Sequence, residues 1–326
     1  MDAPPPPRTN PLAWLSLLLG VLAPVTCGAT GPFALLFGYL ALRRVNLSEG
    51  RLPGARAARL GLVLGALGIV LFFGALFVVG LNQMRGKSEL TGCTNNLRRI
   101  GQAVNLYYDL NGNKHYPPGT IAVPGLEPER RLSWMVAILP YMEVEPTPVP
   151  VDAKSPAAFH KGEALYKHFD LSKGWQDDPN RQAMSGAPLW YICPAASYRP
   201  PPGEAALTQY VGIGGFGLDA PTLPKTNVRA GFFGYDRVID RDDVKRGTSQ
   251  TMILTERAHA VGPWAAGGLA TVTGIDPQEQ PYVPRQFGGL HPHGANTLFA
   301  DSHVTFILDR AEPKVWEDQS RINVDY

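Results

Sequence analysis

The sequence has few cysteines, few histidines and, after residue 82, no concentrated run of positive charge, and these shortages exclude several classes of protein. Among 326 residues there are 3 cysteines and 7 histidines. No two cysteines have the C-x-x-C spacing of a structural zinc site. The formal net charge is only +2, and after residue 82 no predicted face gathers lysine and arginine. We therefore do not expect nucleic acid as a partner.

Charge is also scarce in most of the first 81 residues. Residues 60–81 are 22 residues without a charged side chain, which is long enough for a helix to cross a hydrocarbon core of about 30 Å. Residues 12–42 are uncharged as well, but Pro24, Pro32 and several glycines interrupt them. We interpret this stretch as one kinked span, because each half is too short to cross alone. A signal peptide is the alternative for this first span.

Charge therefore divides the chain into three parts. A proline-rich tail at 1–11 precedes a two-span membrane domain at 12–81, and residues 82–326 form a soluble domain. The loop between the spans, at 43–59, contains five arginines and a single acidic residue, Glu49. Short arginine-rich loops stay in the cytoplasm, so this loop predicts that both termini lie on the other side of the membrane.

The soluble domain contains only two cysteines, Cys93 and Cys193, because Cys27 lies in the predicted membrane domain. Outside the cytoplasm two such thiols form a disulfide readily. The bond would close a loop of about a hundred residues and stabilise the fold by a few kcal/mol. We expect this disulfide; the alternative is two unpaired, buried cysteines.

Apolar spacing in the soluble domain predicts one long helix followed by short strands. Between residues 89 and 110, apolar side chains recur every three or four residues, which indicates an amphipathic helix. These are Leu90, Cys93, Leu97, Ile100, Val104 and Tyr107. Predicted strands follow at 189–194, 208–215, 231–236 and 248–256, with a closing pair around Asp301. The pattern predicts an α+β domain in which a long helix packs on an antiparallel sheet.

Several segments of residues 88–310, taken in order, resemble a large bacterial family of uncharacterised, prepilin-like proteins. The segments are CTNNLRRIGQAVNLYYDLNGNKHYPPG, RLSWMVAILPYME, LYKHFDLSKGWQDDPN, YICP, GTSQTMILTE and HPHGANTLFADSHVTFI. That family ends in a His-x9-Asp-Gly motif, and His291 and Asp301 have this spacing. Residues 10–81 separately resemble a small two-span membrane domain of unknown function.

The resemblance implies a fold related to the pseudopilins of type II secretion, in which an apolar N-terminal helix carries a sheet domain. Two positions depart from the pattern. Pilin-like proteins are cut at a glycine before a Phe-Thr-Leu-x-Glu stretch, and no such stretch precedes the span at 60–81, which favours a permanently anchored chain. Ser302 also stands where the family has glycine.

The C-terminal stretch 287–307 is unusually rich in histidine, and it permits two interpretations. The first is a metal site built from His291, His293, Asp301 and His303. The second, which we favour, is a β-hairpin whose turn includes Asp301 and Ser302, because apolar residues alternate on both sides of them. The Asp-Gly pair of the family suits a type I′ turn, so serine there would be strained unless a different loop is used. We expect His291 to hydrogen-bond Asp301 or the turn backbone.

Other candidate sites are weaker. The acidic run Asp240, Asp242 and Asp243 suits calcium, but basic neighbours neutralise it. A triad of Ser249, His259 and Asp276 has no supporting motif. Glu256 ends a predicted strand, where a surface or capping carboxylate is the simpler interpretation. We therefore predict no catalytic residues and no cofactor.

Together these observations predict a multi-pass protein of the cytoplasmic (inner) membrane with an extracytoplasmic, pseudopilin-like domain. We expect a structural or interaction role, with the lipid bilayer and other pilin-like or secretion-apparatus subunits as partners. The alternative is a membrane-tethered binding module for an extracellular ligand, either a glycan or a metal ion.

Overall fold

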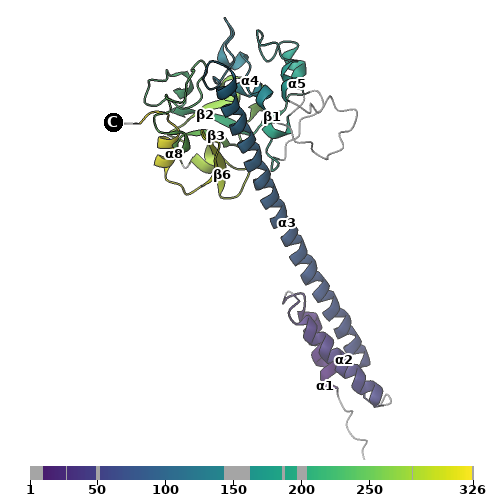
Figure 1. The fold of residues 1–326 in the computed structure, drawn as a ribbon. Helices are drawn as coiled ribbons and strands as arrows, with labels where there is room; N and C mark the ends of the chain where they lie inside the picture. The colour runs from purple at the N-terminus through teal and green to yellow at the C-terminus, as the bar shows by residue number, and fades with distance from the viewer. Residues whose placement is uncertain are drawn as a thin grey trace, which may run out of the picture. The chain divides into compact units, whose positions relative to one another are not determined.

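The computed structural model describes residues 10–26, 28–48, 52–142, 162–185, 188–196, 204–280 and 282–324. The chain divides into two compact units, residues 1–85 and 86–326, and the long helix α3 (Ala55–Leu110) contributes to both (Figure 1). Cys27 and all of the predicted tail except its last two residues lie outside the described residues.

Two helices form in the stretch that the sequence predicted as one kinked span, so that prediction is wrong. They are α1 (Pro11–Leu22) and α2 (Gly31–Leu47). The chain between them turns at Gly28, whose φ of 79° is the left-handed conformation that favours glycine. Pro32 then lies in the first turn of α2, where a missing N–H costs nothing. The break is therefore a full reversal of the chain.

Small residues let the two helices of this hairpin pack closely against α3. A Cβ atom added at Gly61 of α3 would lie 2.2 Å from Ser16 Oγ, and one at Gly65 would lie 2.9 Å from Ala34 Cβ. Ser16 Oγ in turn donates a hydrogen bond of 2.7 Å to the carbonyl oxygen of Ala34. The first unit is thus a three-helix assembly with short interhelical distances, as small-residue interfaces between apolar helices allow.

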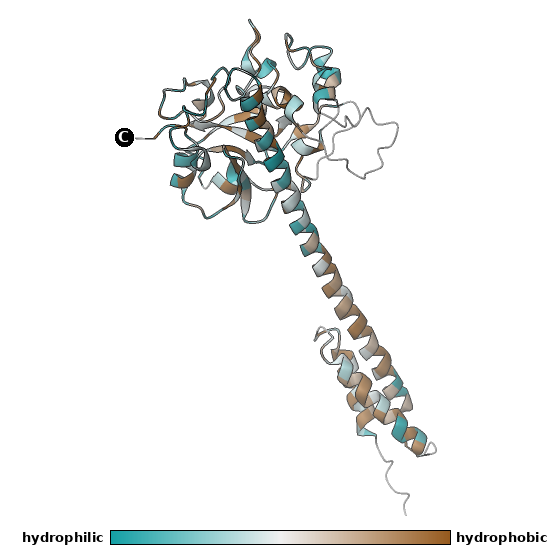
Figure 2. Ribbon diagram, viewed as in Figure 1, coloured by the Kyte–Doolittle hydropathy of each residue, from teal (hydrophilic) through white to brown (hydrophobic). Residues whose placement is uncertain are grey.

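Only one described helix, α3, is long and apolar enough to cross a membrane, so the prediction of two spans is wrong. At 1.5 Å per residue the 12 residues of α1 and the 17 of α2 are both shorter than a hydrocarbon core of about 30 Å. The apolar part of α3 is brown in Figure 2. Its exposed side chains include Leu60, Val63, Leu67, Val70, Leu71, Phe73, Leu76 and Phe77.

The second unit is built on a five-stranded sheet with the order β5-β2-β3-β6-β7. The strands are β2 (Tyr210–Phe216), β3 (Met252–Glu256), β5 (Val272–Ile275), β6 (Gly294–Phe299) and β7 (Val304–Leu308). Neighbours are antiparallel except β2 and β5, which are parallel. The C-terminal half of α3 packs on this sheet, and Leu97 and Ile100 share a core with Leu254 and Leu298. The α+β prediction is confirmed, with a mixed rather than purely antiparallel sheet.

Short elements surround the sheet. They are α4 (Trp134–Ala137), α5 (Gly162–Tyr166), α6 (Asn180–Ala183), α7 (Tyr282–Arg285), α8 (Pro313–Gln319) and a two-stranded ribbon of β1 (Leu207–Thr208) and β4 (Gly262–Pro263). The segments at 189–194 and 231–236, predicted as strands, are not strands; the first contains the 3-10 helix η3 (Leu189–Tyr191).

The closing hairpin forms where the sequence predicted it, with Thr297 of β6 opposite Thr305 of β7. Its turn differs from type I′. Ser302 has a φ of 73°, and Ser302 N donates to Phe299 O at 2.9 Å while Phe299 N donates to His303 O at 3.0 Å. This is a three-residue loop that ends in a left-handed residue. This loop needs a positive φ at Ser302 alone, whereas a type I′ turn needs one at both central residues. The loop therefore costs less backbone strain than the predicted turn would.

Candidate functional site at the buried disulfide

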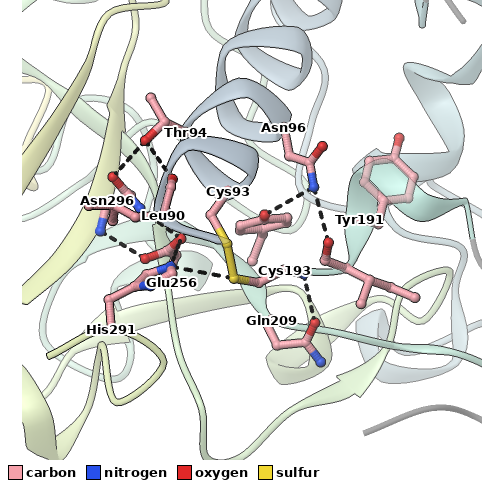
Figure 3. Close-up of a disulfide and its surroundings, with 12 residues drawn as sticks. Leu90, Cys93, Thr94, Asn96, Tyr191, Cys193, Gln209, Glu256, His291 and Asn296 are labelled. Carbon is pink, nitrogen blue, oxygen red and sulfur yellow. Dashed lines mark hydrogen bonds and ion pairs between the residues drawn. A yellow bond between two sulfur atoms is a disulfide. The ribbon is translucent and has the colours of Figure 1, made fainter. Parts of the chain in front are cut away.

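A disulfide joins α3 to the sheet domain. Cys93 on α3 and Cys193, just after η3, are bonded, with their Cα atoms 5.1 Å apart (Figure 3). Both are fully buried. The predicted disulfide is confirmed, and the alternative of two unpaired cysteines is wrong.

Polar side chains hold the backbone on both sides of the bond. Gln209 Oε1 accepts a hydrogen bond of 3.1 Å from Cys193 N. Asn96, one turn after Cys93 on α3, donates from Nδ2 to the carbonyl oxygen of Ile192 at 3.0 Å. The two half-cystines are thus positioned by contacts that do not depend on the disulfide itself.

A carboxylate and an imidazole lie directly against the disulfide. Glu256, the last residue of β3, is fully buried, and His291 is 7% exposed. His291 Nε2 lies 3.5 Å from Cys193 Sγ and 3.5 Å from Glu256 Oε1. One ligand atom from each of Cys93, Cys193, Glu256 and His291 falls within 4.8 Å of the others. Four residues that are far apart in sequence therefore share one buried cluster, which we call the Cys-Glu-His cluster.

A chain of hydrogen bonds fixes the carboxylate of Glu256. Asn296 donates to it twice, from its backbone N to Oε2 at 2.9 Å and from Nδ2 to Oε1 at 3.1 Å. Thr94 Oγ1 lies 3.1 Å from Asn296 Oδ1. Because Thr94 follows Cys93, this chain returns to α3 (Figure 3). Charge-assisted bonds of this kind offset part of the cost of burying a carboxylate.

The negative charge of Glu256 also acts on a neighbouring tyrosine. Burial, with a contribution from the Glu256 charge, raises the pKa of Tyr210 well above its usual 10.0, against the opposing effect of a hydrogen bond from Asn96. Burial likewise raises the pKa of Tyr191 well above its usual value. Both phenols are therefore neutral at physiological pH.

The histidines of the C-terminal stretch do not gather into one site. Asp301 Oδ1 accepts hydrogen bonds from His303, from N at 3.1 Å and at Nδ1 at 2.6 Å. His291 contacts Cys193 and Glu256 instead, so the expected hydrogen bond from His291 to Asp301 or to the turn backbone is wrong. His293 Nδ1 lies 3.5 Å from Asp309. The metal site that was the alternative interpretation of these four residues does not form, and only His291 enters the Cys-Glu-His cluster.

Glu256 is the residue that sequence reasoning placed wrongly, because it is fully buried rather than a surface carboxylate. Its partners come from residues about 40 and 160 positions away in the chain. The available signal was its position at the end of TMILTE, a run that reads as a buried strand. A carboxylate that continues such a run needs an internal partner.

The acidic run at 240–243 forms a turn. Asp240 N donates to Asp243 Oδ2 at 3.0 Å, and Asp243 N donates to Asp240 Oδ1 at 2.9 Å. Lys225 Nζ contacts the same Asp243 carboxylate at 2.7 Å. Within the described parts of the chain, the Cys-Glu-His cluster is the group of His, Cys, Asp and Glu residues close enough to hold a metal, and the acidic run is not.

Residues 91–271 match the model of a family described as a protein of unknown function (DUF1559), and the match covers more than half of the chain. The chain belongs to the DUF1559 family. No curated protein and no solved structure matches it. In this DUF1559 protein, the matched residues include Cys93, Cys193 and Glu256, whereas His291 lies beyond them.

Proposed function

We propose that this DUF1559 protein is a membrane-anchored, extracytoplasmic structural or interaction protein with a pseudopilin-like organisation. In this proposal it serves as a component or accessory of a pilin-like or secretion-related apparatus, and no catalytic role is assigned to it. One observation carries the proposal. The single helix α3 contains both an apolar segment with exposed large side chains and an amphipathic segment buried against the sheet. The resemblance to pseudopilins implies this combination.

The membrane anchor in this proposal is the apolar part of α3. A helix that exposes side chains such as Val63, Val70 and Phe77 to water would be unfavourable, whereas lipid accommodates them. The disulfide supports a compartment outside the cytoplasm for the sheet domain, since cytosolic thiols are kept reduced.

In this proposal the α1–α2 hairpin, which precedes α3 in the chain, lies beside α3 as a re-entrant element that enters and leaves the membrane on the same side. Its turn lies beside the middle of the apolar segment, where Pro24 and Gly28 share an apolar cavity with Leu71 and Phe72. Its open end lies near the start of α3, because a Cβ atom added at Gly54 would lie 3.0 Å from Ala13 Cβ. Both ends of the hairpin are then on the same side.

Arginines identify that side. Arg43 and Arg44 lie near the C-terminus of α2, and Arg56 and Arg59 lie in the first turns of α3. The positive-inside rule then places the open end of the hairpin in the cytoplasm. The proposed protein thus crosses the membrane once, with the N-terminus inside and the C-terminal domain outside. This replaces the sequence-based expectation that both termini lie outside.

Crosslinking in intact cells tests the proposed role. A photoreactive amino acid replaces Phe77, which is 67% exposed, and in a matched control it replaces Phe72, which is partly buried and lines the cavity beside the hairpin. We expect Phe77 to give a regular ladder of assemblies and Phe72 to give only intramolecular products. A single monomeric species at both positions would contradict the apparatus role and favour a tethered binding module.

A tethered module that binds a metal ion is the second candidate, and the Cys-Glu-His cluster is the observation that favours it. Its four side chains are buried together, and their atoms are of the kinds that bind zinc.

A further inference from the structure

The Cys-Glu-His cluster combines the three ligand types found in tetrahedral zinc sites. Two cysteine sulfurs, an imidazole nitrogen and a carboxylate oxygen come together from α3, the segment after η3, the end of β3 and the segment before β6 (Figure 3). Closed zinc sites with four protein ligands stabilise folds without leaving a position for substrate. In the oxidised chain the sulfurs are bonded to one another, and only free thiolates bind zinc.

We propose that reduction of the Cys93–Cys193 disulfide converts this cluster into a structural zinc site. A small dithiol supplies two electrons and two protons, which breaks the S–S bond, gives two thiols and leaves the dithiol as a disulfide. Zn²⁺ then replaces both thiol protons, which pass to solvent. His291 Nε2 and one oxygen of Glu256 complete the four ligands.

The distances around His291 already suit the reduced site. With zinc bonds of about 2.0–2.3 Å at tetrahedral angles, nitrogen and sulfur ligands lie about 3.5 Å apart, and nitrogen and oxygen ligands about 3.4 Å apart. His291 Nε2 lies 3.5 Å from Cys193 Sγ and 3.5 Å from Glu256 Oε1. The two sulfurs must separate on reduction, because two thiolate ligands of one zinc ion lie farther apart than two bonded sulfurs.

The groups around the cluster hold its ligands as the outer shell of a metal site does. The two hydrogen bonds from Asn296 fix the orientation of the Glu256 carboxylate. Gln209 holds the backbone of Cys193 at 3.1 Å. Such partners orient ligands before the metal binds. A buried disulfide alone needs neither an imidazole nor a carboxylate beside it, whereas two cysteine thiolates need two further ligands to complete a tetrahedral zinc site.

The consequence is a link between α3 and the sheet domain in both redox states. The disulfide makes this link under oxidising conditions. Zinc makes it when the thiols are reduced. The same four side chains therefore serve two bonding modes.

Cobalt binding tests the proposal on the full-length chain in detergent, in a Cys27→Ser background so that only two cysteines remain. The oxidised chain and the dithiol-reduced chain, freed of dithiol under anaerobic conditions, are each titrated with Co²⁺. We expect the reduced chain alone to show thiolate-to-cobalt charge-transfer bands and tetrahedral cobalt bands. One equivalent of Zn²⁺ should abolish both.

Variants identify the nitrogen and oxygen ligands. His291→Ala and Glu256→Gln should each weaken binding by about 10-fold or more. His303→Ala is the matched control, because His303 is half-exposed and bonds Asp301 instead; it should bind as the parent does. Circular dichroism of each oxidised variant shows whether it is folded.

Three results would overturn the proposal: equal metal uptake by the oxidised and reduced chains, no uptake by the reduced chain whether folded or not, or unchanged affinity in both ligand variants. The last result would mean that the two thiolates bind cobalt without His291 and Glu256 as ligands. If a ligand variant fails to fold, the comparison of oxidised and reduced parent chains still decides. None of these results bears on the membrane role, which crosslinking tests separately.

Discussion

Ser302 shows how one side chain offsets the cost of its own backbone conformation. Its φ of 73° costs a non-glycine residue about 1 kcal/mol. Its hydroxyl, however, accepts a hydrogen bond of 2.9 Å from Asn105 Nδ2, and Asn105 also donates to Ala300 O at 3.0 Å. The serine thus connects the hairpin turn to α3.

We therefore expect Ser302→Gly to change the free energy of unfolding by less than about 1 kcal/mol, since relief of the backbone and loss of the hydrogen bond nearly cancel. Asn105→Ala should destabilise by about 1–3 kcal/mol, because Ala300 O loses its donor. Denaturant unfolding of the two variants measures both values. A Ser302→Gly chain that is stabilised by more than about 1 kcal/mol would show that the Asn105 bond contributes nothing.

Tyr210 makes the stability of the fold sensitive to alkali. Its pKa in the folded state is raised well above 10.0 by burial and by the Glu256 charge, whereas in the unfolded chain it is near that value. Stability from the neutral phenol is therefore complete below about pH 10 and is lost as the pH rises further. Tyr210→Phe should reduce the slope of unfolding free energy against pH above 10 by about 1.4 kcal/mol per pH unit. Equal slopes in the parent and variant would mean that Tyr210 ionises in the fold.

Elements differ in how well the sequence predicts them. The amphipathic part of α3 and the β6–β7 hairpin follow local apolar spacing, and both form as predicted. The segment at 231–236 looks equally strand-like. Instead it runs beside β2 without forming a strand: Ala230 makes an isolated bridge with Gly215, and a Cβ atom on Gly231 would lie 2.4 Å from Gly215 N. No local pattern encodes this close approach, because it depends on a glycine elsewhere in the chain.

The α1–α2 hairpin was not predicted from the sequence, for a similar reason. A single kinked helix and a hairpin have the same composition, and the choice depends on which residues of α3 are available to pack against. The missing side chain of Gly61 lets the backbone of Ser16 approach α3 closely, and only the folded unit shows this contact. The Cys-Glu-His cluster is also a product of tertiary structure, although its two cysteines were predictable because the soluble domain has no others.

Gly61 provides the test at the scale of elements. A Cβ atom there would lie 2.2 Å from Ser16 Oγ and 2.6 Å from the backbone carbon of Ser16, so α1 must move. We expect Gly61→Ala to destabilise the first unit by about 1–3 kcal/mol. Gly74→Ala is the matched control, because its Cβ would meet nothing within 4 Å and alanine favours a helix.

Thermal unfolding in detergent compares the two alanine variants. The account predicts a lower melting temperature for Gly61→Ala and an equal or higher one for Gly74→Ala. Equal melting temperatures for the two variants would mean that α1 does not pack against α3 at Gly61.

The disulfide contributes to the stability of the whole C-terminal unit, because its two cysteines are 100 residues apart. The chain-entropy model gives about 4.7 kcal/mol for a loop of this length, and measured losses are typically 2–5 kcal/mol. A Cys93→Ala, Cys193→Ala double variant should lose stability in that range when compared with the oxidised parent by denaturant unfolding. A loss below about 1 kcal/mol would contradict a structural role for the bond.

The topology of the chain is the central claim, and reporter fusions at both ends test it most directly. Alkaline phosphatase is active only outside the cytoplasm, and green fluorescent protein exported in an unfolded state does not fluoresce. A single span through α3 predicts active phosphatase and dark fluorescent protein at the C-terminus, with a fluorescent fusion at the N-terminus. Fluorescence at the C-terminus, or active phosphatase at the N-terminus, would contradict the account.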